Sequence, residues 1–155
     1  MRNRFDVLAN EADVFRFATQ GGHFLPPGRR KPDSEWLRPT SDDKEEAKER
    51  GRVPGLSCWQ SDGTGPATAR ALVGRSVEDV AFEANVGAIR RVAALVASAQ
   101  NEPAIQVEVL HDPAERYRPE PGWEQHAVIE GLDRPPMAKK SAYTTLRSAL
   151  VGCFE

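Results

Sequence analysis

The stretch Ala104–Leu132 constrains the fold of this chain more than any other. Two apolar runs, AIQVEVL and HAVIEGL, stand on either side of a polar loop that is rich in proline and charged residues. Apolar residues that alternate with polar ones are typical of β-strands, because successive side chains of a strand point to opposite faces. We therefore predict two strands joined by a long connection, with His111 at the end of the first and His126 at the start of the second. If these strands pair as neighbours near the middle of the sheet, both imidazoles lie at its loop end.

The same alternation predicts which face each side chain takes. In the first strand, His111 continues a row of valines that suits the core. The second strand leaves two alternatives open. If Ala127 and Ile129 face the core, His126 points away from His111. If the other face is buried, the two histidines can meet, but Glu130 is carried inward, and burying a carboxylate costs several kcal/mol unless it is ion-paired.

A metal site is the first function to weigh for this stretch. His111, Asp112 and His126 are side chains of the types that bind zinc. They lack the tight spacing of two histidines on one helix or strand. The sequence His-Asp-Pro is also typical of a turn in which the aspartate accepts hydrogen bonds from nearby backbone amides. We therefore predict no metal ion here.

The rest of the chain indicates short elements and many loops, since it contains 12 proline and 12 glycine residues. Apolar residues recur at three- and four-residue steps in 86–98 and 138–153, which predicts two helices with one buried face each. We expect shorter helices at 40–50 and 66–73, and strands at 13–19, 53–59, 77–82, 104–111 and 126–132. This order predicts an α+β domain, with a small mixed or mainly antiparallel sheet packed on one side by two helices. The 155 residues fit a single domain with a flexible, loop-rich segment at about 20–54.

The charge balance limits the classes of partner. The chain has 21 basic and 23 acidic residues and a net charge of −2, whereas a general nucleic-acid or anionic-membrane surface needs a clear positive excess. No apolar run reaches the roughly 18 residues of a membrane-spanning helix, and the N-terminus lacks the pattern of a signal peptide. Cys58 and Cys153 are far apart and are interpreted as reduced thiols. We therefore predict a cytoplasmic protein.

A second pattern of residues points to enzymatic chemistry. Arg16, Ser57 and the pair Gln106-x-Glu108 occur on three predicted strands in that order. This order resembles the arginine, serine and Gln-x-Glu motifs of ADP-ribosyltransferase toxins. The resemblance implies NAD as cofactor, with Arg16 on a phosphate, Ser57 ordering the site and Glu108 stabilising an oxocarbenium-like centre. The middle motif departs from the family, because Ser57 is followed by Cys58 and Trp59 where a serine–x–serine sequence is expected.

Nucleophilic catalysis by a serine or a cysteine, as in hydrolases, is less favoured by the sequence. Ser57 does not lie in the G-x-S-x-G turn of a serine hydrolase. Cys58 could be paired with His111 or His126, but a cysteine inside an apolar strand usually contributes packing.

The leading hypothesis from the sequence is a binding or adaptor module that recognises another protein. Tryptophan, tyrosine and arginine dominate binding hot spots, and the loop between the two strands predicted in Ala104–Leu132 is rich in them. The predicted binding residues are those of this loop and the two flanking histidines, Arg116, Tyr117, Arg118, Trp123, His111 and His126. The chain is also similar in its strand–HDP–loop–HA–strand arrangement to small bacterial proteins, so we expect a bacterial protein. For a binding module we expect no cofactor. The alternative is a small NAD-dependent ADP-ribosyltransferase-like enzyme, which requires Arg16, Ser57 and Glu108 to meet in one cleft.

Overall fold

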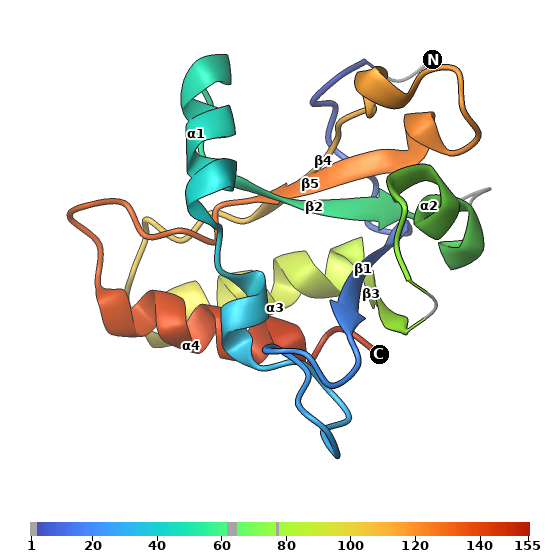
Figure 1. Ribbon diagram of the computed structural model, residues 1–155. Coiled ribbons are helices and arrows are strands. Elements are labelled where there is room, and N and C mark those ends of the chain that lie inside the picture. Colours follow the sequence, from blue (N-terminus) through green and yellow to red (C-terminus); the bar gives the residue numbers. More distant parts are fainter. Residues whose placement is uncertain (1–2, 62–64, 77) are drawn as a thin grey trace.

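A five-stranded antiparallel sheet forms the centre of the molecule. The computed structural model describes residues 3–61, 65–76 and 78–155 (Figure 1). In the sheet the strands follow the order β3-β1-β2-β5-β4, and every pair of neighbours is antiparallel. The strands are β1 (Asp13–Thr19), β2 (Gly55–Gln60), β3 (Asp79–Asn85), β4 (Glu108–His111) and β5 (His126–Glu130). The helices are α1 (Ser41–Arg50), α2 (Pro66–Val73), α3 (Val86–Ala99) and α4 (Lys140–Val151). Single 3-10 turns lie at Ser34–Leu37, Glu115–Tyr117 and Trp123–Gln125. The predicted α+β class is confirmed.

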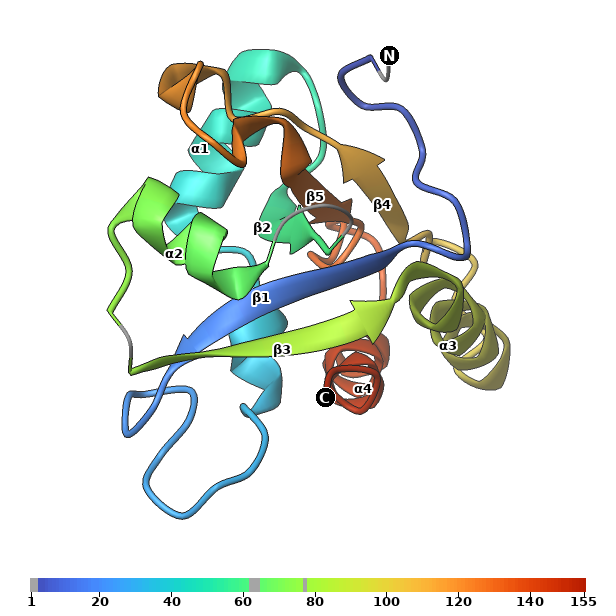
Figure 2. The ribbon, with the colours of Figure 1, turned by 90° about the vertical axis from the view of Figure 1, so that its right-hand side faces the viewer.

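The two long helices cover one face of the sheet, as the sequence predicts. In Figure 2, α3 and α4 lie together on one side of the strands, and α1 and α2 lie on the other. The main core fills the space under α3 and α4, with strand residues such as Val14, Leu56, Val109 and Ile129, each at most 3% exposed. The opposite face has a smaller apolar cluster in which Phe15, Phe17 and Trp59 pack against Ala69 of α2. Helices therefore cover parts of both faces.

Local signals in the sequence account for α1, although only Ala47 of this helix is buried. Thr40 accepts a hydrogen bond from the Asp43 amide, and the Asp43 carboxylate accepts one from the Thr40 amide, which satisfies two backbone donors at the helix start. Gly51 ends the helix in the left-handed conformation, at φ 67°. These caps stabilise α1 as a helix although it has no large apolar face.

The register of β4 and β5 resolves the two alternatives for the second strand. Val109 pairs with Ile129 and His111 with Ala127, and all four are buried on the α3/α4 face. His126 therefore points to the opposite face, away from His111, and Glu130 lies on that opposite face too.

The buried Glu130 is ion-paired there. Its two carboxylate oxygens accept hydrogen bonds from Nε and Nη2 of Arg52, each at 2.8 Å. Such a two-point contact offsets the cost of removing a carboxylate from water.

Two details of these strands differ from the sequence-based expectation. β4 begins at Glu108 instead of Ala104, because β5 ends at Glu130 and the chain turns at Gly131, where φ is 94°. A Cβ at Gly131 would lie 2.0 Å from the Gln106 carbonyl oxygen, so only glycine fits this turn. β4 is also an edge strand of the sheet, whereas the sequence predicts a position near the middle. Its outer side is partly paired with residues 5–8, where Leu8 N donates to Val109 O at 3.0 Å and His111 N donates to Asp6 O at 2.8 Å.

The Arg52–Glu130 pair yields a prediction for stability. Glu130→Gln is expected to lower the free energy of unfolding by about 1–2 kcal/mol, because an amide cannot accept both hydrogen bonds of the guanidinium. The loss stays modest since the Arg52 side chain is 33% exposed. Urea denaturation checks it, with Glu49→Gln on the exposed side of α1 as the control. Equal losses in the two variants would contradict a stabilising role for the pair.

Candidate functional site

A cleft of about 260 Å³ lies on the face of the sheet that α1 and α2 cover. Its floor is formed by Ser57 and Trp59 of β2 and His126 of β5. Glu46 and Arg50 of α1 line one side, and the segment 112–117 that follows β4 lines another. The segments that meet here are far apart in the sequence.

A serine and a histidine are hydrogen-bonded at the floor of this cleft. Ser57 Oγ lies 2.6 Å from His126 Nε2, and His126 Nδ1 lies 2.7 Å from the main-chain oxygen of Asp112. A carbonyl oxygen can only accept, so Nδ1 carries the proton. Nε2 then has a free lone pair and accepts the hydrogen bond from the Ser57 hydroxyl. This tautomer is the one in which a histidine can take a proton from a serine.

The surroundings of His126 keep its imidazole neutral. Burial lowers the pKa of His126, and this effect outweighs the hydrogen bond to Asp112 and the nearby carboxylates, which raise it. The ring of Trp59 packs edge-on against the imidazole, with the ring centroids 4.9 Å apart. At neutral pH the histidine therefore has the protonation state of a general base.

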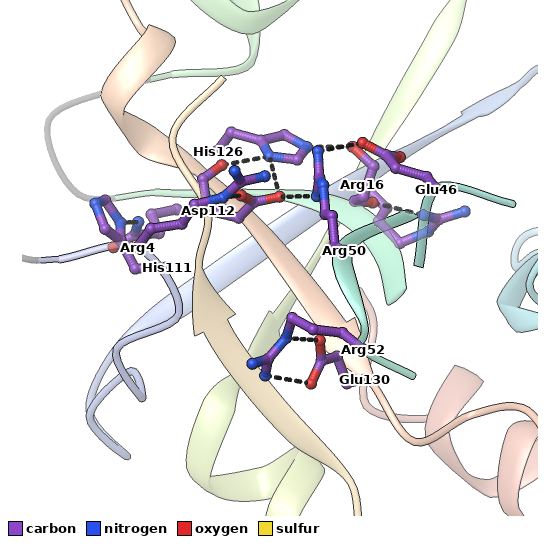
Figure 3. Close-up of polar contacts among 11 residues, drawn as sticks. Arg4, Arg16, Glu46, Arg50, Arg52, His111, Asp112, His126 and Glu130 are labelled. Carbon is purple, nitrogen blue, oxygen red and sulfur yellow. Dashed lines mark hydrogen bonds and ion pairs between the residues drawn. The ribbon is translucent and has the colours of Figure 1, made fainter. Parts of the chain in front are cut away.

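Asp112 anchors the other side of the histidine. Its carboxylate is buried, accepts a hydrogen bond from Arg4 Nε at 2.7 Å and lies 3.4 Å from Arg50 Nη1. Figure 3 shows the carboxylate between these arginines and His126. Asp112 Oδ2 is 3.7 Å from His126 Nδ1, so the closer contact is to the main-chain oxygen of the same residue. Arg50 is also ion-paired with Glu46.

Arg16, the first of the three ADP-ribosyltransferase-like residues, lies next to Ser57 but not in the cleft. Its Nη1 donates to the Ser57 main-chain oxygen at 2.5 Å and its Nη2 to the Trp36 main-chain oxygen at 3.1 Å. β1 and β2 pair only at Val14–Gln60 and Phe15–Trp59. Beyond these pairs, the Arg16 guanidinium donates to the Ser57 main-chain oxygen in place of a backbone amide. Burial lowers the pKa of Arg16 to about 10. The geometry gives Arg16 a structural contact to Ser57.

Glu108, the third of these residues, lies elsewhere. It is on β4, three strands away from β1 in the sheet, which corresponds to roughly 14 Å at the usual spacing of strands. Its carboxylate accepts a hydrogen bond from Arg90 Nε at 2.9 Å. Arg16, Ser57 and Glu108 therefore do not meet in one cleft, and ADP-ribosyl transfer stays a prediction that the geometry does not favour.

Only some of the predicted binding residues line the cleft. Arg116, Tyr117 and His126 line the cleft. Arg118 lies over the Trp123 ring, 5.3 Å from its centroid. His111 is buried on the opposite face, with Nδ1 2.9 Å from Gln60 Nε2. The structure therefore separates the two histidines that flank the loop.

Other residues of the site were not singled out by the sequence. Arg4, Glu46 and Arg50 belong to segments that look like an irregular lead-in and a solvent-exposed helix. The one signal for the serine–histidine pair was strand alternation, which places Ser57 and Trp59 on the same face of β2.

Cys58, the other candidate nucleophile, is buried. Burial raises the pKa of Cys58 to about 12, so its thiol is protonated at neutral pH and is not an active nucleophile. No group of three or more His, Cys, Asp or Glu side chains in the described part of the chain is placed to hold a metal ion. None of the described helices has the length and apolar character needed to cross a membrane.

The lowered pKa of His126 predicts how stability depends on pH. Below its ordinary pKa of 6.5 the unfolded chain binds a proton at this residue more readily than the folded protein does. The free energy of unfolding must then fall as the pH drops from 6.5 toward the lower pKa of the folded state, and this contribution is absent above that window. Denaturation at several pH values between about 7.5 and 5 should show a shallower fall for His126→Gln than for the wild type. Identical slopes would contradict the burial of a neutral imidazole.

Comparison of the chain with protein-family models, with curated proteins and with solved structures gave no match, so the function is inferred from the geometry of the site.

Proposed function

We propose that this protein is a serine-nucleophile enzyme that hydrolyses a small ester or related acyl compound. The observation that supports this proposal is the 2.6 Å contact between Ser57 Oγ and the free lone pair of His126 Nε2 in a cleft. A serine hydroxyl is a weak nucleophile until an adjacent base accepts its proton, and a neutral histidine is the base used most often.

The steps follow from the positions of these two side chains. Ser57 Oγ attacks the carbonyl carbon of the substrate while its proton moves to His126 Nε2. The tetrahedral intermediate then collapses, the bond to the leaving group breaks, and His126 gives its proton to that group. Water attacks the acyl-serine with His126 again as the base, which releases the acid and restores Ser57. The overall reaction consumes one water molecule and needs no other reactant.

Arg50 is the cation best placed to stabilise the negative charge that develops on the substrate oxygen. Its guanidinium lies beside His126 and Asp112 (Figure 3). The 3.4 Å distance from Nη1 to Asp112 Oδ2 is longer than a strong charge-assisted hydrogen bond, so this donor can shift toward an oxyanion. The side chain is 32% exposed, which places it at the border of the cleft and water.

Hydrolysis of p-nitrophenyl acetate tests the proposal. Purified protein should release p-nitrophenol in many turnovers, and the acid limb of its rate profile should reflect the lowered pKa of His126. At neutral pH the rate should already be on its plateau. Release of no more than one equivalent, or a rate equal to that of buffer, would overturn the proposal.

A second candidate function is recognition of a partner protein in the cytoplasm through residues 112–125. Two arginine–aromatic contacts on this segment favour it, because Arg116 lies over Tyr117 at 5.0 Å and Arg118 lies over Trp123 at 5.3 Å. Both arginines are exposed.

The double variant Tyr117→Ala, Trp123→Ala should release any protein that crosslinks to the wild type in cells. Retention of every crosslinked protein by the double variant would count against this function. The unbridged state of Cys58 and Cys153 fits a reducing compartment.

A further inference from the structure

We propose that the substrate carries an anionic group, a carboxylate or a phosphate, that binds Arg116 at the cleft. This inference deepens the proposed hydrolase function and rests on it, because the same cleft supplies Ser57 and His126.

The arginines around the cleft differ in whether a carboxylate of the protein pairs with them. Arg4 is ion-paired with Asp112, and Arg50 is ion-paired with both Asp112 and Glu46. Arg116 also lines the cleft, but no carboxylate among the described residues forms an ion pair with it. Two of the three arginines therefore already have carboxylate partners, and Arg116 is the one whose charge is available to an anionic group of a ligand.

Arg116 differs from the neighbouring Glu115, which also lines the cleft, in its effect on His126. Arg116 is one of the charges that act on His126, whose pKa it helps to lower, and Glu115 is not among them. The positive charge of Arg116 therefore acts at the serine–histidine pair. The Tyr117 ring supports this arginine, 5.0 Å from the guanidinium carbon, which restrains the side chain before a ligand arrives.

Apolar side chains form part of the remaining cleft wall. Trp59, Val73 and Tyr117 offer apolar surface next to the serine–histidine pair. The volume of about 260 Å³ is just below the usual range for ligand pockets, so only a small ligand fits. The geometry thus fits a small acyl chain against the aromatic rings, with its anionic end on Arg116. An arginine binds both carboxylate and phosphate oxygens through two parallel hydrogen bonds.

Two esters of equal chain length test the charge preference. p-Nitrophenyl valerate is neutral, and mono-p-nitrophenyl glutarate ends in a carboxylate. The wild type is expected to hydrolyse the glutarate ester with a kcat/KM about ten-fold higher, mainly through a lower KM, as expected when one charge-assisted contact is added. Arg116→Gln should remove this preference, whereas Arg30→Gln, a change at an exposed arginine that does not line the cleft, should retain it. Equal kcat/KM values for the two esters in the wild type would overturn the inference.

A binding experiment separates this inference from the hydrolase function. Ser57→Ala is expected not to turn over an ester, so binding of glutarate, inorganic phosphate and neutral glutaramide to this variant can be followed by tryptophan fluorescence, since Trp59 lines the cleft. Binding of an anion but not of glutaramide, lost on adding Arg116→Gln, supports the inference even if no ester is hydrolysed. Tighter binding of glutarate than of phosphate would identify a carboxylate substrate, and the reverse a phosphate. Absence of binding by both anions, with esters still hydrolysed, would overturn the inference alone.

Discussion

Ser57→Ala is expected to reduce ester hydrolysis by about 10³-fold, to the background rate, because no other hydroxyl contacts His126 Nε2 in the described residues. The loss should appear in kcat and not in KM, since the hydroxyl forms its new bond only during the reaction. Ser57 is exposed, so removing its oxygen should leave the free energy of unfolding within about 0.5 kcal/mol of the wild type. Steady-state kinetics and thermal unfolding of the same preparation check both statements.

Ser61→Ala is the matched control for this prediction. Ser61 follows β2 directly, and its hydroxyl donates to Glu83 at 2.7 Å instead of contacting a histidine. This variant should hydrolyse the ester at the wild-type rate. A large loss in Ser61→Ala, or none in Ser57→Ala, would mean that the ester reacts at some other group.

His126→Gln is expected to lower kcat by about 10³-fold at neutral pH, because glutamine can accept a hydrogen bond from Ser57 but cannot take its proton. The small remaining activity should lose the acid limb that His126 imposes, and should rise with hydroxide concentration. Measuring the rate from about pH 5 to about pH 9 distinguishes a lost base from a distorted cleft. A variant that retains the acid limb would assign that limb to another group.

Asp112→Asn discriminates between the two ways in which Asp112 can orient this histidine. His126 Nδ1 is 2.7 Å from the Asp112 main-chain oxygen and 3.7 Å from its carboxylate. Because the main-chain contact survives the substitution, kcat should fall much less than in His126→Gln. The variant should be less stable, since Arg4 and Arg50 both lose a charged partner. A fall in kcat equal to that of His126→Gln would assign the orientation of the histidine to the carboxylate.

Alternation of apolar residues was sufficient to predict much of the sheet and its buried face. Strand β1 and helix α2 have the predicted bounds, and α1, α3 and α4 differ from them by a few residues at most. For β5, the second strand of Ala104–Leu132, the sequence allowed either face to be buried. The choice depended on Arg52, whose pairing with Glu130 over the outer face could not be read from a local pattern.

The site itself depends on long-range register, which local patterns do not contain. Ser57 meets His126 because Trp59 pairs with His126 and Ser57 with Val128, so the two side chains are diagonal neighbours on one face. A shift of one residue would place them on opposite faces. Arg4 reaches Asp112 only because residues 5–8 lie along the edge of β4. The G-x-S-x-G criterion is also specific to one fold, and a serine on a flat strand does not meet it.

The most direct test of the proposed chemistry is covalent labelling with a fluorophosphonate, followed by mass spectrometry of peptides. The reagent forms a stable bond with a serine only when a neighbouring base activates its hydroxyl. We predict one adduct, on Ser57, in the wild type and in Ser61→Ala, and a strongly reduced adduct in His126→Gln. An unlabelled Ser57 in folded wild-type protein, or labelling that is equal with and without His126, would contradict the assignment of Ser57 as the nucleophile.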